Sequence, residues 1–512
     1  MNFQSYKVQT ALNVVTGLFA VVVQFAVSFF LSPFIVRTLG AEANGFSQLA
    51  NNFVMYASLL TIAFNSMAAR FVSVAYHQNE FDRANKLYSS IFIVDVLICI
   101  LLLPISALII FNLEHVVVIE NADVLDVKVL FACVFLNFFM SLVMSLFSLA
   151  MYVKNKVFHS NLLNAVKAIL NATLLLVVFS VFPAKIFYIS MVASFLTMMM
   201  LPIYRRLQAR LLPEVCFQYK NFSFLYVKEL LSSGIWNTVN QCGHLLNTGL
   251  DLLLANWFIS PFSMGLLAIS KIIPSAIIQL STTLNGNFSP SVTQTWAKGN
   301  REALLRELRI AMKVSTIIVS VPIVTFCCFG YDFYKLWQPT LPATELTVIS
   351  ILGCMAFIPV SGTQTLYNVF TATNKLRVNS ISFIFMGLLN VLVVFLGLTY
   401  SKEYGIYVIA GCSTTLSIFR NMIVTLPYTA YLLNMKWFEF YKDVLQTLLC
   451  CSINVFISLL FVFVFHLEGW LGLFIMCGLT VVFTLLIDIY YYLNKNERDI
   501  LFKILKIRKN NG

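Results

Sequence analysis

Apolar runs long enough to cross a lipid bilayer follow one another along this 512-residue chain, with few residues between them. A helix needs about 20 mostly apolar residues to cross roughly 30 Å of hydrocarbon. Hydrophobic residues make up 59% of the chain and charged residues 11%. A water-soluble fold would therefore expose far too much apolar surface, and the pattern predicts an all-α polytopic membrane protein.

The polar breaks between these runs divide the chain into about 14 predicted transmembrane helices. They are, in chain order, 11–36, 46–67, 89–112, 127–152, 161–182, 184–203, 232–257, 262–288, 309–331, 346–372, 378–400, 405–433, 444–466 and 470–493.

An internal repeat relates the first six predicted spans to the second six. When the chain is shifted against itself by about 220 residues, Gly45 falls on Gly265 and Asn65 on Asn285, and the polar breaks recur in the same order. Because six is an even number of crossings, both copies point the same way across the membrane, as in transporters with parallel repeats. The sequence predicts two parallel six-helix repeats followed by a C-terminal helix pair.

This repeat gives five predicted parts of the chain. They are an N-terminal six-helix lobe (1–210), a cytoplasmic linker with an interfacial helix (211–231), a C-terminal six-helix lobe (232–433), an extra transmembrane helix pair (434–493) and a basic amphipathic cytoplasmic tail (494–512).

The distribution of positive charge gives the orientation. Of 34 Lys and Arg residues, 26 lie at the termini, in connections after even-numbered spans or at the span ends that adjoin them, and five lie in connections after odd-numbered spans or at the span ends that adjoin those. Cytoplasmic loops are enriched in Lys and Arg, so both termini are predicted to be cytoplasmic. Most of the net charge of +12 is then explained by positive residues that set the topology and face anionic lipid. It requires no nucleic-acid partner.

Cations inside the predicted spans are the first candidates for function, because each costs about 2.5–3.5 kcal/mol on insertion scales. Lys271 and Arg420 lie too deep to reach the interface easily, so either a water-filled path or a buried ion pair must hold them. Lys167 and Arg37 lie closer to an interface, where snorkelling and a cavity are both open interpretations.

Acidic and neutral polar residues extend this set. Asp95 in the third span and Asp251 in the seventh are the candidates for ion coupling, although Asp251 could also pair with Lys271. Polar positions recur on one face of the first helix of each copy, which predicts a polar stripe on a central cavity. The predicted cavity-lining residues are Gln24, Asn65, Asn240, His244, Asn247 and Asp251.

Motifs for catalysis are missing from the sequence. It contains no GxxxxGK[ST] phosphate loop, no HExxH and no GxSxG. The cysteines lie almost entirely in apolar runs and form no CxxC pair, so they indicate neither a metal site nor a disulfide framework. The predicted outer connections are too short for an extramembrane catalytic site. We therefore predict a transport protein that is not an enzyme and has no cofactor.

Six short segments, three in each copy, carry a family resemblance. In the first copy these are Arg37-Thr-Leu-Gly-Ala-Glu-Ala-Asn-Gly45, Asn65-Ser-Met-Ala-Ala-Arg70 and His77-Gln-Asn-Glu-Phe-Asp-Arg83; in the second they are Gly234-Ile-Trp-Asn-Thr-Val-Asn240, Gly265-Leu-Leu-Ala-Ile-Ser-Lys-Ile-Ile-Pro274 and Ala297-Lys-Gly-Asn-Arg301. They are similar to the O-antigen and capsule repeat-unit flippases of the multidrug/oligosaccharidyl-lipid/polysaccharide exporter superfamily. The resemblance covers nearly the whole chain.

This resemblance implies a V-shaped pair of lobes in the bacterial inner membrane that opens alternately inward and outward. The substrate would be an undecaprenyl-diphosphate-linked oligosaccharide, moved from the cytoplasmic to the outer leaflet. Lys271 and Arg420, with Lys167 and Arg37, would bind its diphosphate, and Arg70 would belong to the entry gate. Coupling to Na⁺ or H⁺ is compatible with this scheme. A polysaccharide polymerase and glycosyltransferases would be the protein partners.

Three other functions stay open. A lipid II flippase would differ only in the sugars that fit. A cation-coupled multidrug exporter would need acidic residues in its cavity, whereas the deep charges here are cationic. A membrane-embedded polymerase or ligase is the least favoured, since the chain has an internal repeat and no large outer loop.

Overall fold

Helices make up the structured part of the chain in a computed structural model that describes residues 3–464, 468–494 and 498. No strand occurs among these residues. Thirteen helices within the described residues are long and apolar enough to cross a membrane. The protein is thus an all-α polytopic membrane protein, as its sequence predicts. The predicted tail, 494–512, lies outside the described residues apart from Asn494 and Arg498.

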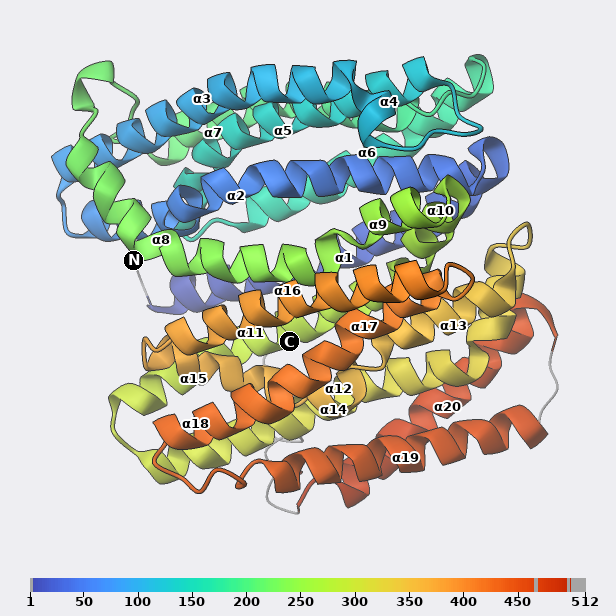
Figure 1. Ribbon diagram of the computed structural model, residues 1–512. Helices are drawn as coiled ribbons and strands as arrows, with labels where there is room; N and C mark the ends of the chain where they lie inside the picture. The colour runs from blue at the N-terminus through green and yellow to red at the C-terminus, as the bar shows by residue number, and fades with distance from the viewer. Residues whose placement is uncertain (1–2, 465–467, 495–497, 499–512) are drawn as a thin grey trace. The chain divides into compact units, whose positions relative to one another are not determined.

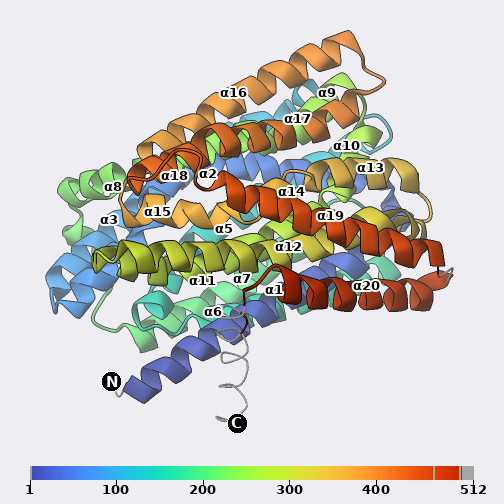
Figure 2. The ribbon, with the colours of Figure 1, turned by 90° about the horizontal axis from the view of Figure 1, so that it is seen from below.

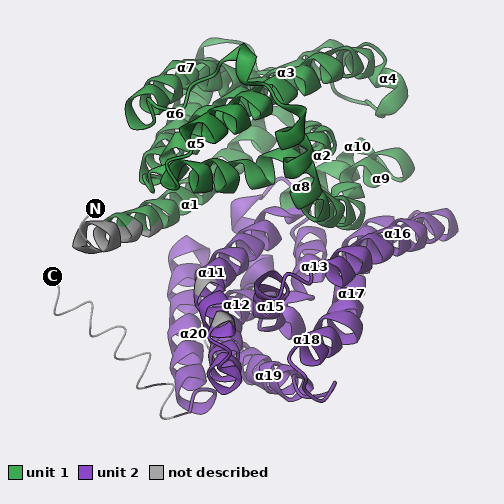
Figure 3. Ribbon diagram, turned by 90° about the vertical axis from the view of Figure 1, so that its left-hand side faces the viewer, with its two compact units in different colours: residues 1–269 green, residues 270–512 purple. Residues whose placement is uncertain are grey.

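The chain forms two compact units, residues 1–269 and 270–512 (Figure 3). The elements of the first are α1 (Phe3–Leu39), α2 (Ala41–His77), α3 (Phe81–Phe111), α4 (Leu113–Val116), α5 (Val124–Val153), α6 (Phe158–Val181), α7 (Tyr188–Leu211), η1 (Tyr219–Asn221), α8 (Phe224–His244), η2 (Leu245–Gly249), α9 (Asp251–Phe258) and α10 (Pro261–Ser270), whose last residue enters the second unit (Figure 1).

The second unit contains the remaining helices. They are α11 (Ile272–Ala297), α12 (Arg301–Trp337), α13 (Ala343–Cys354), α14 (Phe357–Val360), η3 (Thr363–Leu366), α15 (Tyr367–Ala372), α16 (Arg377–Tyr400), α17 (Gly405–Arg420), η4 (Asn421–Thr425), α18 (Leu426–Leu432), α19 (Tyr441–Val464) and α20 (Gly469–Tyr491) (Figure 2).

The predicted seventh span, 232–257, accounts for the difference between about 14 predicted spans and 13 qualifying helices. It is helical, but the π-turn η2 and a bend at Leu250 divide it into α8 and α9. Neither piece is both long and apolar enough to qualify. The polar residues that mark this segment in the sequence therefore belong to an interrupted helix, which begins at Phe224, inside the predicted linker.

Each unit has its own apolar core. In the first unit, α2 packs against α3, α5 and α8, and its core includes Val72, Leu87, Leu146 and Leu230. In the second unit, a core cluster including Leu308 on α12 also has residues from α11, η3 to α15, α18 and α19. Small residues allow the closest approaches, as is usual between membrane helices.

The bounds of the helices reproduce the internal repeat. Helix α2 covers 41–77 and its copy, α10 with α11, covers 261–297, a shift of 220 at both ends. Helix α5 covers 124–153 and its copy, α13 to α15, covers 343–372, a shift of 219 at both ends. The shift of 219 also relates α6 (158–181) to α16 (377–400). The helix bounds thus confirm the predicted duplication at these three elements.

Helix α5 and its counterpart α15 end with the same backbone structure. Asn155 has φ = 54° and its counterpart Asn374 has φ = 55°, in the left-handed region that Asn tolerates better than most residues. Beyond each, a backbone N–H reaches back five residues, from Lys156 to Met151 and from Lys375 to Phe370. This Schellman-type bond satisfies a terminal carbonyl and ends the helix, so a short Asn-Lys pair marks the same boundary in both copies.

The two copies differ in the continuity of their helices. All six long helices of the first copy (α1, α2, α3, α5, α6 and α7) run without interruption, whereas four of the six in the second copy are broken. The breaks lie at η2, at Lys271, between α13 and α15, and at η4. Interrupted helices at membrane depth must have their freed carbonyls satisfied by neighbouring groups, because hydrocarbon offers no water.

A side chain from a neighbouring helix satisfies a carbonyl at every one of these breaks. At η2, Tyr56 Oη and Asn52 Nδ2 donate to the Gly249 carbonyl oxygen over 2.6 and 3.0 Å. At η4, Tyr441 Oη donates to Met422 over 2.6 Å. Serine hydroxyls bind the carbonyls at the other two breaks. Ser350 Oγ donates to the Ser270 carbonyl over 2.9 Å, and Ser315 Oγ donates to the Ser361 carbonyl over 3.1 Å.

The Ser350 hydroxyl replaces a backbone hydrogen bond that Pro274 cannot make. Pro274 has no N–H, so it cannot donate to the carbonyl four residues earlier, that of Ser270. We expect Ser350→Ala to lower the free energy of unfolding by about 1–3 kcal/mol, since it removes two buried hydrogen bonds, one to the Ser270 carbonyl and one with the Tyr334 hydroxyl. Thermal unfolding in detergent measures this change. Ser452→Ala is the matched control, because Ser452 is exposed and bonds only within its own helix; equal shifts for both variants would contradict the prediction.

Candidate functional site

Arg420 is the last residue of α17, directly before the π-turn η4, and only 4% of its surface is exposed. Its Nη2 donates to the Tyr367 hydroxyl, and its Nη1 lies 3.4 Å from Asn379 Oδ1. Its guanidinium carbon lies 3.4 Å from the centroid of the Phe383 ring. Helices α15 and α16 thus supply two neutral polar groups and an aromatic face around one buried cation.

A second layer of contacts holds this arrangement in place. The Tyr367 hydroxyl donates to Asn421 Oδ1 over 2.8 Å, and Asn421 Nδ2 donates to the Ser417 carbonyl over the same distance. Asn379 is 7% exposed and Asn421 is 1% exposed. The guanidinium is therefore positioned by side chains that are themselves held by hydrogen bonds. The adjacent π-turn η4 sets the direction in which the Arg420 side chain leaves its helix. Such single π-turns occur often at functional sites.

The positive charge of Arg420 is not compensated by a carboxylate. Among residues 3–464, 468–494 and 498, no ion pair includes Arg420. A buried charge without a countercharge is costly, and neutral donors and a ring face offset only part of that cost. A guanidinium has five N–H donors in a planar fork that matches carboxylate and phosphate oxygens. The site is therefore suited to an anionic ligand.

Lys271 occupies the interruption between α10 and α11. It is half-buried and has φ = −75° and ψ = −10° as the residue that precedes α11. Its position follows from Pro274 in the first turn of α11, which has no N–H to donate to the Ser270 carbonyl and so interrupts the helix there. Lys271 and Arg420 thus share a structural context, because each lies at a break in a helix of the second copy.

The other predicted cations lie in different surroundings. Lys167 on α6 is half-buried, and its Nζ donates to Thr197 Oγ1 on α7 over 2.6 Å. Thr197 in turn donates to Asn137 on α5, so this lysine belongs to a hydrogen-bonded network inside the first unit. Arg37 is exposed in the last turn of α1, and Arg70 is exposed near the end of α2. Their roles in diphosphate binding and in gating stay predictions.

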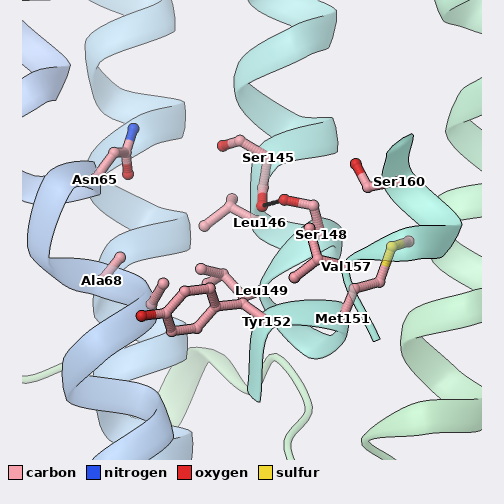
Figure 4. Close-up of a pocket in the computed structure, with 11 residues that line it drawn as sticks. Asn65, Ala68, Ser145, Leu146, Ser148, Leu149, Met151, Tyr152, Val157 and Ser160 are labelled. Carbon is pink, nitrogen blue, oxygen red and sulfur yellow. Dashed lines mark hydrogen bonds between the residues drawn. The ribbon is translucent and has the colours of Figure 1, made fainter. Parts of the chain in front are cut away.

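Asn65 and Asp95 contact one another. Asn65 Nδ2 on α2 donates to Asp95 Oδ1 on α3 over 3.2 Å, and Asp95 is 1% exposed. The second carboxyl oxygen of Asp95 has no hydrogen-bond partner among the described residues. Asn65 also lines a cavity of about 280 Å³ between α2, α5 and α6, where it lies across from Ser145 and Ser148 (Figure 4).

The remaining predicted polar residues follow the first helix of each copy. Gln24 and His244 are exposed, and Thr248 Oγ1 lies 3.3 Å from His244 Nδ1. Asn240 is half-buried on α8, and Asn247 lies in the π-turn η2. Asp251, at the start of α9, is 2% exposed. Only part of the predicted polar stripe is therefore accessible.

Sequence reasoning missed the residues that surround Arg420. Tyr367, Asn379 and Phe383 lie in apolar stretches and carry no charge, so no composition signal singles them out. A comparison of equivalent positions in the two copies does single out two of these residues. At a shift of 219, Tyr367 falls on Ser148 and Asn379 on Ser160, so the large residues of the second copy replace small ones in the first.

Comparison with known proteins places this fold among membrane transporters. No family model matches the chain. An uncharacterized membrane protein EpsK of Bacillus subtilis (strain 168) is 27% identical over 507 residues, which is 98% of each chain.

Solved structures give the fold. The lipid II flippase MurJ, in an inward closed conformation, has a TM-score of 0.66 at 15% identity over 95% of this chain and 98% of its own. An inward-facing multidrug resistance MATE family transporter of the MOP superfamily has a TM-score of 0.65 at 12% identity, over 82% and 98%. The chain has the fold of these transporters. It is a multi-pass membrane protein.

Proposed function

We propose that this protein is a flippase for an undecaprenyl-diphosphate-linked oligosaccharide and acts in surface polysaccharide biosynthesis. It moves this lipid from the cytoplasmic to the outer leaflet by opening alternately to the two sides. The observation that carries the proposal is Arg420, a guanidinium 4% exposed at a helix break, whose partners among the described residues are all neutral. Its uncompensated charge supports an anionic substrate.

A diphosphate is the anion that this chemistry fits in a membrane. Arginine forms paired hydrogen bonds to phosphate oxygens, and a second cation such as Lys271 adds a point charge. A membrane potential that is negative inside favours outward movement of an anion by about 2.3 kcal/mol per charge per 100 mV. Coupling to Na⁺ or H⁺ through Asp95 or Asp251 adds to this driving force.

The cellular setting follows from the same proposal. The excess of Lys and Arg in connections after even-numbered spans supports cytoplasmic termini, and the substrate supports the bacterial inner membrane as the location. Glycosyltransferases would supply the lipid-linked oligosaccharide on the cytoplasmic side, and a polymerase would consume it outside.

Lipid II transport and drug export are the competing functions. Lipid II presents the same diphosphate, so the Arg420 site accommodates either lipid and the sugars alone separate them. Export of cationic drugs is favoured by one observation, the buried carboxyl of Asp95, whose second oxygen has no partner among the described residues. A carboxyl of this kind attracts cations, whereas Arg420 repels them.

Transport in vesicles separates these functions. The purified chain, reconstituted with a radiolabelled undecaprenyl-diphosphate-linked oligosaccharide, should expose that lipid to an impermeant phosphatase faster than empty vesicles do. Lipid II and the cationic dye rhodamine 6G are run in parallel. Faster movement of lipid II than of the oligosaccharide lipid would shift the assignment to a lipid II flippase, and dye export without lipid movement would shift it to a drug exporter.

A further inference from the structure

Equivalent positions of the two copies differ in what occupies them. In the second copy, Tyr367 on α15 and Asn379 on α16 contact Arg420 on α17. Their counterparts at a shift of 219 are Ser148 and Ser160, and both of these line the cavity of the first unit. The same local position thus surrounds a cation in one copy and lines a cavity in the other.

The sizes of the side chains explain the hollow. Ser145 and Ser148 in the first copy correspond to Gln364 and Tyr367 in the second, at a shift of 219. Ala68 corresponds to Phe288 at a shift of 220. Each exchange removes several heavy atoms from the first copy. A cavity of about 280 Å³ results, somewhat below the roughly 300–1,000 Å³ of sites for drug-sized ligands.

The lining of the cavity presents hydrogen-bond acceptors. Ser148 donates its proton to the Ser145 carbonyl and Ser145 donates to the Leu142 carbonyl, so the lone pairs of both hydroxyls remain for a ligand. Asn65 uses its Nδ2 on Asp95, which leaves its Oδ1 as an acceptor at the cavity (Figure 4). A ligand with several donors of its own, such as hydroxyls, matches this pattern.

The lining is also neutral. Among the described residues that line the cavity, none is charged, and Tyr152 adds an aromatic ring. A phosphate would find no cation there, and an aliphatic chain would leave the serine and asparagine oxygens unsatisfied. An uncharged ring that carries hydroxyl groups satisfies the acceptors and packs its apolar face against Tyr152.

We propose that this cavity is a binding subsite for one uncharged sugar ring of the transported lipid. The inference rests on the proposed function, and the residues of the first copy that bind the sugar are Asn65, Ser145 and Ser148. Divergence after duplication thereby produced two subsites of different chemistry from one local position.

Two probes test the subsite on the full chain in vesicles: undecaprenyl diphosphate, and undecaprenyl diphosphate that carries one N-acetylglucosamine. The wild type should move the sugar-bearing probe faster. Ser148→Tyr, which introduces the side chain of the second copy, should lower that rate about tenfold and leave the sugar-free rate unchanged. Ser180→Tyr, the same change at an exposed position of α6, is the matched control and should keep the wild-type ratio.

Asn65→Leu supplies a second variant that removes an acceptor without filling the cavity, in case Ser148→Tyr does not fold. It should lower the sugar-bearing rate in the same direction. Equal effects on both probes, or none, would overturn the subsite while the flippase assignment stands. A wild type that moves neither probe overturns the flippase. In that case, binding of labelled N-acetylglucosamine to the solubilised chain tests the sugar subsite by itself. Binding that is lost in Ser148→Tyr supports the subsite, and no binding to the wild type overturns it.

Discussion

Replacing Arg420 by Gln is expected to lower the rate of lipid movement about a hundredfold, because charge-assisted hydrogen bonds to phosphate are worth roughly 1.5–3 kcal/mol each. The folded chain should keep its thermal stability. The change removes a buried charge that has no carboxylate partner among the described residues, and removing such a charge also removes its desolvation cost. Initial rates with the oligosaccharide lipid and a thermal unfolding curve measure the two effects.

Two further variants sharpen this prediction. Arg420→Lys keeps the charge but loses the planar fork, so its rate should fall between those of the wild type and Arg420→Gln. Arg206→Gln removes an exposed arginine from α7 and should leave the rate unchanged. A structural role alone would instead lower stability in step with transport. A wild-type rate in a stable Arg420→Gln protein would remove the observation on which the proposed function rests.

Replacing Gly234 by Ala is expected to have the largest effect on folding. A Cβ atom at Gly234 would lie 1.9 Å from the Ala63 carbonyl oxygen, which belongs to the backbone of α2 and cannot rotate away. Overpacking of this kind costs about 1–3 kcal/mol, and more where the backbone must shift. We expect Gly234→Ala to separate α8 from α2 and to lower the melting temperature in detergent by several degrees.

The control for this prediction is Gly286→Ala on α11, where a Cβ atom meets nothing within 4 Å. Alanine is also a better helix former than glycine by about 1 kcal/mol, so this control should be neutral or stabilising. A Gly234→Ala protein as stable as the wild type would mean that α2 and α8 can separate slightly at no cost, contrary to the close packing described here.

Much of the fold could be predicted because the membrane imposes a strong length and composition rule. The duplication was visible in pairs such as Gly45 with Gly265, and the helix bounds repeat with the same shift. The interruptions were harder to predict. Prolines occur inside continuous helices, such as Pro104 in α3, and near broken ones, such as Pro274 in α11. Proline alone therefore does not locate a break.

The site was only partly predictable for a related reason. Arg420 is conspicuous in the sequence because an ionised side chain in a membrane span is rare. Its partners Tyr367 and Asn379 are neutral, and their role depends on how α15 and α16 pack against α17, which is a tertiary property. The cavity at Ser145 and Ser148 is a difference in side-chain volume between the copies, and neither copy alone displays it.

The uneven distribution of helix breaks has a mechanical consequence. A continuous helix resists bending along its length, whereas a break whose carbonyl already bonds to a side chain can change angle by exchanging one hydrogen bond for another. The first copy therefore consists of continuous helices, whereas four of the six long helices of the second copy are broken, among them those that carry Lys271 and Arg420. We therefore expect bending during transport to occur in the second copy, at the breaks beside its deep cations.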